Sequence, residues 1–237
     1  MSMFVDAHVH YHELGRSYKD VIILAVSDDL ESSRKTLSLA GEMVLPCAGI
    51  HPWCVENSSL RDLEELERML KRGKIVCLGE IGLDGRRRNS YSRQIEFFTE
   101  QLRMAADFSL PVNLHTLDAW REVLDMLDRY EIEGAIFHWF TGPLDLLGEL
   151  RSRGYFITIN PAVMIQEKHM RVLVEAPLDM ILTESDGPYV YRGIRLDPSM
   201  IPALVSVISK VKGISTEDLK LRLIENLSRF LGRAITP

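Results

Sequence analysis

Two histidines one residue apart close an apolar run near the start of the chain, Phe4-Val5-Asp6-Ala7-His8-Val9-His10. If this run is a β-strand, His8 and His10 lie on the same face, because successive side chains of a strand point to opposite faces. Neutral imidazole is a common metal ligand, and two rings on one face can bind the same ion. The spacing therefore predicts a metal site whose other ligands come from elsewhere in the chain.

Four further candidate ligands stand at or just past the ends of other apolar runs: Glu80, His115, His138 and Asp186. A single histidine in such a place is ordinarily a core residue. Six imidazoles and carboxylates at the same ends of five strands are different, because burying them together without a cation costs several kcal/mol. The six residues therefore predict one shared metal centre.

The types of ligand indicate the metal and the chemistry. Imidazole and carboxylate without thiolate suit Zn²⁺, Mn²⁺, Fe²⁺ or Co²⁺, and Mg²⁺ where waters complete the coordination. Six ligands exceed the three that one catalytic zinc takes, so we expect two divalent ions, with Mg²⁺, Mn²⁺ and Zn²⁺ as candidates. A carboxylate such as Glu80 can bridge two ions at ~3.5–4 Å and hold a shared water, which becomes the nucleophile of a hydrolase.

Short β-branched runs alternate with longer amphipathic stretches, which predicts parallel βα units. The helix predicted most strongly spans residues 91–108, and another follows Ser58 or Ser59 and ends before Gly73. Further helices are expected after Asp118, from about Pro202 to Gly213, and after the capping box of residues 215–218. The predicted strands cover residues 3–8, 21–26, 43–48, 75–80, 111–115, 134–138, 155–159 and 180–184.

Eight such units in 237 residues predict an α/β fold, a single (β/α)8 TIM-type barrel, regular or distorted, that occupies residues 1–237 as one domain. The rival is an open doubly wound sheet. In a barrel the carboxyl ends of all strands surround one mouth, whereas in an open sheet they lie along an edge. The six candidate ligands favour the barrel, with the metal site at its C-terminal mouth.

Composition narrows the class of protein. A formal net charge of −6 argues against generic adhesion to nucleic acid or to anionic membranes, so any site for a polyanion must be local. The sequence shows no signal peptide and no apolar run near the ~20 residues of a membrane span, and we expect a soluble, cytoplasmic protein without a membrane partner. Cys47, Cys54 and Cys77 are sparse and lack Cys-x-x-Cys spacing, which favours reduced, buried thiols over a disulfide framework.

Several segments together resemble the TatD-related metal-dependent deoxyribonucleases, a family of the amidohydrolase superfamily of barrels. The resemblance extends from residue 4 to Pro188, with a weaker one over residues 225–231. The segments are His8-x-His10, Gly49-Ile50-His51-Pro52, Gly79-Glu80-Ile81-Gly82-Leu83-Asp84, Pro111-Val112-Asn113-Leu114-His115, Phe137-His138-Trp139-Phe140-Thr141-Gly142 and Thr183-Glu184-Ser185-Asp186-Gly187-Pro188.

The resemblance implies ligands and a reaction. It makes His8, His10, Glu80 and Asp186 the ligands of one metal ion, and Glu80, His115 and His138 those of a second. It implies hydrolysis of phosphodiester bonds, in family members often trimming DNA from a 3′ end, so the expected substrate is DNA, single-stranded or at a 3′ end. Glu80 and Asp186 are the expected catalytic residues, with Asp186 accepting or relaying a proton.

Other residues are candidates for contacts with substrate or for positioning the ligands. His51 is expected to contact a phosphate, with a structural loop histidine as the alternative. Asp84 could orient a ligand or only form the turn at Asp84-Gly85, and Glu184 is expected to orient a ligand. We expect His12 and His169 to stay outside the site, His169 on the surface.

The densest positive cluster consists of Arg86, Arg87, Arg88 and Arg93, which could hold phosphates if the loop after the fourth strand leans over the mouth. The alternative is a solvated loop. The aromatic residues expected to flank the mouth are Trp53, Trp139, Phe140, Tyr189 and Tyr191. Each could stack a base of a single strand, and packing in the core or at the rim is the alternative.

The sequence also departs from the family pattern. Gly85 and three arginines follow Asp84, where the family usually has an aromatic residue, and Thr116-Leu117-Asp118 stands where the family usually places an arginine. The segment of residues 160–163 departs as well. Because such positions would contact substrate, a small amide, lactone or phosphoester is the alternative substrate. A third hypothesis is a catalytically silent scaffold, and the complete set of metal ligands argues against it.

Overall fold

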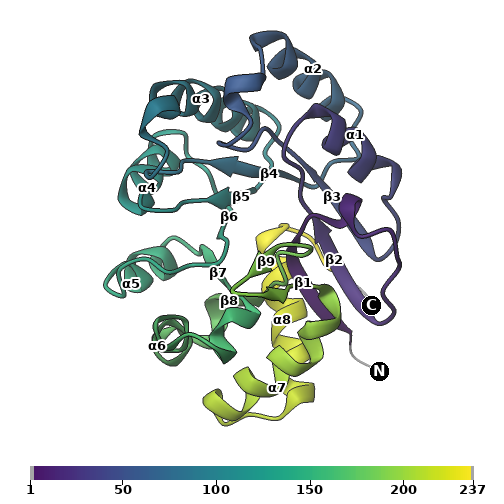
Figure 1. Ribbon diagram of the computed structural model, residues 1–237, viewed down its shortest axis with the longest axis vertical. Helices are drawn as coiled ribbons and strands as arrows, with labels where there is room; N and C mark the ends of the chain where they lie inside the picture. Colours follow the sequence, from purple (N-terminus) through teal and green to yellow (C-terminus); the bar gives the residue numbers. More distant parts are fainter. Residues whose placement is uncertain (1–2, 236–237) are drawn as a thin grey trace.

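The computed structural model describes residues 3–235, and in this part of the chain eight parallel strands follow one another around a nearly closed barrel (Figure 1). Each strand pairs with the next along the chain, which is the order of a TIM-type barrel and not of an open doubly wound sheet. Each predicted strand is present, and the largest shift is two residues, at β4. The strands are β1 (Phe4–Val9), β2 (Val21–Ala25), β3 (Val44–Ala48), β4 (Cys77–Gly82), β5 (Val112–His115), β6 (Ala135–Phe137), β7 (Phe156–Ile159) and β8 (Ile181–Thr183).

Helices on the outside of the barrel connect the strands. The helix predicted over residues 91–108 is α3, and Ser59 caps α2 through a capping box with Asp62. Gly213, at φ 66°, ends α7, and Ser215 accepts a hydrogen bond from the backbone of Asp218 at the start of α8. The helices are α1 (Leu30–Ser38), α2 (Leu60–Leu70), α3 (Tyr91–Asp107), α4 (Trp120–Arg129), α5 (Leu146–Ser152), α6 (Glu167–Glu175), α7 (Ile201–Lys212) and α8 (Thr216–Phe230).

Strands β8 and β1 close the barrel without a regular ladder between them. Instead, the Thr183 hydroxyl donates to the Val5 carbonyl (2.5 Å), and the backbone N–H of Asp186 donates to the His8 carbonyl (3.0 Å). Between these bonds the buried Asp6 carboxylate accepts from the Ser185 backbone (2.9 Å), and burial raises the pKa of Asp6 to about 8. The seam therefore joins the segments that carry His8 and Asp186.

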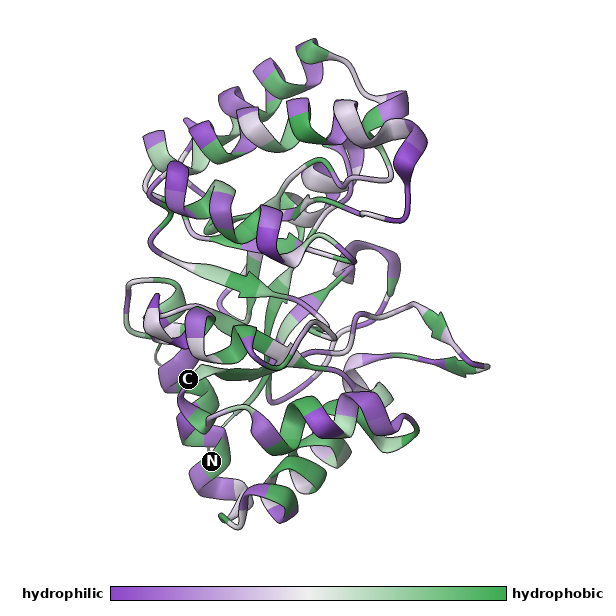
Figure 2. Ribbon diagram, turned by 90° about the vertical axis from the view of Figure 1, so that its left-hand side faces the viewer, coloured by the Kyte–Doolittle hydropathy of each residue, from purple (hydrophilic) through white to green (hydrophobic). Residues whose placement is uncertain are grey.

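A short antiparallel hairpin, β9 (Val190–Tyr191) and β10 (Ile194–Arg195), follows β8 and projects from the body of the protein (Figure 2). In the same view apolar residues fill the strands, and the surrounding helices alternate between apolar and polar residues. This pattern is expected when one face of each helix packs on the barrel. Within residues 3–235, no helix is both long and apolar enough to cross a membrane.

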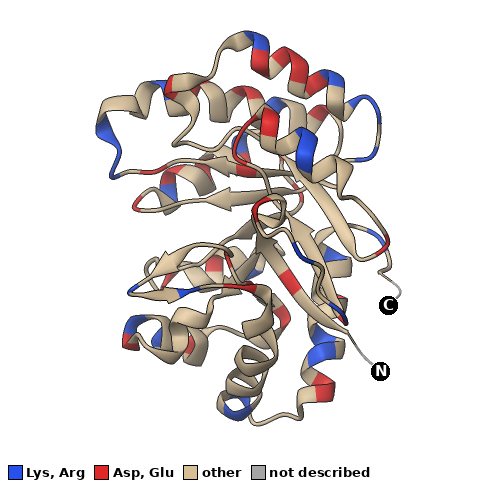
Figure 3. Ribbon diagram, turned by 45° about the vertical axis from the view of Figure 1, so that its right-hand side comes forward, with Lys and Arg blue, Asp and Glu red and all other residues tan. Residues whose placement is uncertain are grey.

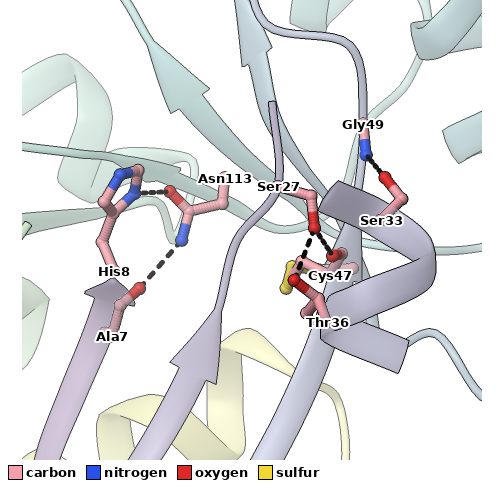
Figure 4. The surroundings of a disulfide bond; sticks show 9 residues. Ala7, His8, Ser27, Ser33, Thr36, Cys47, Gly49 and Asn113 are labelled. Carbon is pink, nitrogen blue, oxygen red and sulfur yellow. Dashed lines mark hydrogen bonds between the residues drawn. A yellow bond between two sulfur atoms is a disulfide. The ribbon is translucent and has the colours of Figure 1, made fainter. Parts of the chain in front are cut away.

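Cys47 and Cys77 form a disulfide, so the prediction of reduced thiols is wrong for this pair. The two residues are 30 positions apart in the chain, but the register of β3 and β4 places them side by side, with their Cα atoms 4.8 Å apart. Both are fully buried, and Ser27 donates a hydrogen bond to the Cys47 carbonyl (Figure 4). Cys54 is a free thiol and is partly buried.

Candidate active site

The Glu80 carboxylate, at the end of β4, is the centre of the site and is 2% exposed. Its Oε2 atom lies 3.3 Å from Nε2 of His8 and 3.4 Å from Nε2 of His10. Its Oε1 atom lies 2.9 Å from Nδ1 of His115 and 3.0 Å from Nε2 of His138. Each carboxylate oxygen of Glu80 therefore faces its own pair of imidazoles.

Asp186, just past β8, joins the side of the site that faces Glu80 Oε2. Its Oδ1 atom lies 3.6 Å from Nε2 of His8 and 3.5 Å from Nε2 of His10. Asp186 adopts φ 54°, a left-handed conformation that is uncommon for residues other than glycine and is often found at functional sites. The barrel thus brings all six predicted ligands together from the ends of five strands.

The outer nitrogen of His8 has a partner that determines the tautomer of the ring. Nδ1 of His8 lies 2.7 Å from Oδ1 of Asn113, and the Asn113 amide nitrogen donates to the Ala7 carbonyl at 2.8 Å (Figure 4). Because the amide oxygen accepts, Nδ1 carries the proton and Nε2 presents a lone pair. That Nε2 atom is buried and makes no hydrogen bond within residues 3–235.

Each of the other three imidazoles has a carboxylate near its outer nitrogen, although Nδ1 of His138 makes no hydrogen bond within residues 3–235. The pairs are His10 Nδ1 with Asp28 Oδ2 (3.1 Å), His115 Nε2 with Asp84 Oδ2 (3.3 Å) and His138 Nδ1 with Glu184 Oε2 (3.5 Å). A second group on the outer nitrogen is the usual support of a metal-binding histidine. Four inner nitrogens around one carboxylate therefore fit divalent cations bound between them.

The close packing of imidazoles and carboxylates shifts the pKa values of several groups in the site. Burial opposes the charge on Glu80, but the imidazoles of His51, His138 and His8 hold the pKa of Glu80 well below its usual value. Burial opposes the charge on His10 and on His138 too, yet carboxylates around each ring raise the pKa of both histidines well above the usual value. The cluster therefore favours bound positive charge.

His51 differs from the four imidazoles above. Its Nδ1 accepts a hydrogen bond from the backbone of Trp53 (3.1 Å), so its proton is on Nε2, which faces Oε1 of Glu80 at 3.1 Å. This ring points a donor, not a lone pair, into the site. His51 is 5% exposed and lines the mouth of the barrel, where the sequence places a contact with substrate.

A cavity of about 320 Å³ opens above Glu80 at the mouth. Of the four arginines predicted to bind phosphate, Arg86 lines this cavity, where its guanidinium pairs with Asp118 at 2.6 Å. Arg87 lies over the ring of Trp53 and Arg88 over that of Tyr91. Arg93 donates to two backbone carbonyls, those of residues 55 and 58, and does not line the cavity.

Two residues near the mouth are placed by their burial. Phe140 is 2% exposed and packs against Trp120 in the core, which is the alternative that the sequence left open, and it does not line the cavity. The expected surface position of His169 is wrong. His169 is 6% exposed and lines the cavity, because α6 turns it inward, where the indole N–H of Trp139 donates to its Nδ1 (3.2 Å). As expected, His12 lies outside the cavity lining, and its Nδ1 faces the Thr36 hydroxyl (3.4 Å).

The remaining predicted residues lie where they can orient others. Asp84 accepts from the indole N–H of Trp53 (2.7 Å) in addition to its contact with His115. Glu184 accepts from the Thr158 hydroxyl and from the Asn160 amide. Both carboxylates are thus held in place by neutral donors.

Sequence reasoning missed Asp28 and Asn113. Asp28 follows the end of β2, the same signal that identified the other candidates. Asn113 stands two residues before His115 on β5 and therefore shares its face of the strand. Either residue could have been found by applying the same two rules to every strand.

Comparison with known proteins agrees with this geometry. The model of the family described as TatD related DNase matches residues 5–232. The chain belongs to this family. An uncharacterized metal-dependent hydrolase of Methanocaldococcus jannaschii is 27% identical, over 98% of each chain. A 3′-5′ ssDNA/RNA exonuclease TatD of Cronobacter sakazakii is 29% identical, over 91% of this chain and 88% of its own.

The fold is shared with solved structures of the same family. A TatD homologue of Escherichia coli, YjjV, has a TM-score of 0.88 and 24% identity, over 99% of this chain and 98% of its own. At this identity the likeness shows the fold alone. Together with the family match, it identifies the chain as a TatD-family, metal-dependent hydrolase of the amidohydrolase superfamily.

Proposed function

We propose that the protein is a nuclease that hydrolyses phosphodiester bonds of DNA with two divalent metal ions, Mg²⁺, Mn²⁺ or Zn²⁺. His8, His10, Glu80 and Asp186 would hold one ion, and Glu80, His115 and His138 the other. The observation that carries this proposal is the position of the Glu80 carboxylate, whose two oxygens face separate pairs of imidazoles. When bound, such ions neutralise charge on the phosphate and lower the pKa of a bound water.

The protein's own residues supply the proton chemistry. Asp186 lines the cavity and is the group best placed to take a proton from the attacking water, because its carboxylate lies beside the ligands on the open side of the site. The Nε2–H of His51 is a donor that can turn from Glu80 to a phosphate oxygen. Arg86 can exchange Asp118 for a substrate phosphate at the edge of the cavity.

Two features favour DNA over a small ester. Relatives of this chain include the ssDNA/RNA exonuclease of C. sakazakii and a human deoxyribonuclease, TATDN3, which is 26% identical over 91% of this chain. The cavity is lined by two cations, Arg86 and Lys168, and by several aromatic rings. A cavity of about 320 Å³ admits the end of a single strand more readily than the body of a duplex.

The test is hydrolysis by the metal-replete protein. The purified chain would be freed of metal, loaded with Mg²⁺, Mn²⁺ or Zn²⁺, and incubated with end-labelled single-stranded and double-stranded DNA and with a small phosphodiester. We expect shortening of single-stranded DNA, and its loss in Asp186→Asn. Hydrolysis of the small ester without cleavage of DNA would instead support the alternative of a small-molecule hydrolase.

A further inference from the structure

One side of the mouth carries a group of rings that the proposed hydrolysis does not use. Trp139 follows His138, His169 belongs to α6, and Tyr189 and Tyr191 belong to the hairpin segment after β8. All four residues line the cavity, and we call them the aromatic wall. Arg86 lines the same cavity. The wall therefore begins one residue from a predicted metal ligand and extends outward from it.

The rings of the aromatic wall meet edge to face. Trp139 and Tyr191 have centroids 5.0 Å apart at 72°, and Trp139 and Tyr189 have centroids 5.8 Å apart at 83°. His169 and Tyr191 meet at 84°. Trp139 and His169 are tilted at 42°, no two of these rings stack face to face, and Tyr189 is 45% exposed. A flat, apolar group can therefore stack on the exposed ring of Tyr189.

His169 adds an unsatisfied donor. Because its Nδ1 accepts from Trp139, its proton is on Nε2, and that atom is buried without a hydrogen-bond partner in the described chain. Burial lowers the pKa of His169 to about 4, so the ring is neutral near pH 7. A buried donor without an acceptor is costly, and because His169 lines the cavity, a ligand bound there could supply the acceptor.

Exposed cations surround the outer edge of the wall. Lys168 lines the cavity and forms no ion pair with any carboxylate within residues 3–235. Arg192 and Arg195 lie on the projecting hairpin, where Lys and Arg are blue in Figure 3. In the amide orientation that satisfies both groups, the Gln166 oxygen accepts from the Arg192 guanidinium at 2.6–3.2 Å, which ties the hairpin to the start of α6. In a chain of net charge −6, this is a local site for anions.

We propose that the aromatic wall is a nucleobase subsite, which binds the unpaired base next to the phosphate being cleaved. Stacking on Tyr189 and Tyr191 and a hydrogen bond from His169 would hold the base, while Lys168 and Arg192 contact phosphates further along the strand. Bases of a duplex are already stacked and paired, so the subsite selects single strands. This inference rests on the proposed nuclease function and names the group that distinguishes a polynucleotide from a simple ester.

The test distinguishes binding of the base from binding of the phosphate, by changing the protein and, separately, the substrate. Tyr189→Ala and His169→Phe would be compared with Val190→Ala, a matched change in the same hairpin at a residue that does not line the cavity. Binding of a phosphorothioate-linked single strand, which resists hydrolysis, would be measured by fluorescence anisotropy. Hydrolysis of DNA and of methyl 4-nitrophenyl phosphate, which has no base, would be measured in parallel.

We expect Tyr189→Ala to weaken binding and to raise KM for single-stranded DNA about 10-fold. His169→Phe should do so about 5-fold, and Val190→Ala should match the wild type. Neither wall variant should change hydrolysis of the small ester, and neither should change binding of a strand whose terminal nucleotides are abasic. Tyr189→Phe should retain binding, because the ring is kept.

Equal loss on the small ester and on DNA, or no change in binding for both wall variants, would overturn the subsite. Failure of the proposed function would give a different result in these assays. In that case the wild type would cleave no DNA under any metal, whereas binding of the single strand and its dependence on Tyr189 would still report on the subsite.

Discussion

The floor of the mouth and its rim are built differently. The floor consists of the six predicted ligands, which come from strand ends, and the outer nitrogen of each imidazole faces an amide or carboxylate such as Asn113 or Asp28. The rim consists of Arg86, Leu117, Lys168 and the aromatic wall, which come from loops, a helix and the hairpin. The floor carries the residues of the family resemblance, whereas the sequence departs from that resemblance on the rim, at Gly85-Arg86 and at Leu117. We therefore expect the barrel to determine the chemistry and the loops to determine the choice of substrate.

Substitution of the central carboxylate should have the largest effect. Glu80→Gln removes the charge that both pairs of imidazoles face, so we expect hydrolysis to fall on the order of 10³-fold or more and the bound metal to decrease. Metal content by mass spectrometry and hydrolysis of single-stranded DNA are the measurements. Glu133→Gln, at an exposed position, is the matched control and should be neutral. Full activity in Glu80→Gln would mean that the floor is not the active site.

A residue that supports the floor from behind should matter less. Asn113→Ala leaves Nδ1 of His8 without its acceptor, so we expect a 10- to 100-fold loss of metal affinity or activity. Asn113→Asp keeps an oxygen at this position and should lose less than Asn113→Ala. Metal affinity measured by competition with a chelator tests this ranking. Wild-type affinity in Asn113→Ala would show that the tautomer of His8 is not controlled from this position.

The rim arginine should affect binding of substrate and leave the chemical step unchanged. For Arg86→Ala we expect KM for single-stranded DNA to rise about 5-fold with kcat retained, because the side chain is exposed and screened by solvent. Arg88→Ala, whose side chain lies over Tyr91 and outside the cavity lining, is the control and should leave KM unchanged. A fall in kcat with unchanged KM would place Arg86 in the chemistry of the floor.

The smallest predicted effect concerns stability at the rim. The pKa of His169 is lowered to about 4 in the folded protein, against about 6.5 when unfolded, so the unfolded chain binds a proton first as the pH falls. The stabilisation is therefore complete above pH 6.5 and decreases below it. Between pH 6.5 and 5 we expect the wild type to lose on the order of 1 kcal/mol more stability than His169→Phe. Denaturant unfolding at both pH values measures this difference, and equal losses would contradict the neutral, buried state of the ring.

Sequence alone predicted the barrel and the floor because both follow from local rules. Alternating side chains place His8 and His10 on one face, and the parallel order of the strands gathers Glu80, His115, His138 and Asp186 at one end. The same rules would have found Asp28 and Asn113 had they been applied to every strand. The local sequence pattern therefore predicts most residues of a site that is built from the ends of strands.

The errors came from contacts that depend on tertiary packing. The pairing of Cys47 with Cys77 depends on the register of β3 and β4, which no spacing in the chain reveals. The burial of His169 depends on how α6 packs against the loop that carries Trp139. The sequence of the helix is polar, and it therefore predicted a surface position.

Electron paramagnetic resonance of the Mn²⁺-loaded protein tests most directly whether Glu80 would hold two ions, as we propose. We predict that the metal-free chain binds two Mn²⁺ ions and that the spectrum shows a spin-coupled pair. In Glu80→Gln the coupled signal should be lost, leaving isolated Mn²⁺ or none. A single uncoupled ion in the wild-type protein at saturating Mn²⁺, together with full hydrolysis of DNA, would contradict the two-metal account.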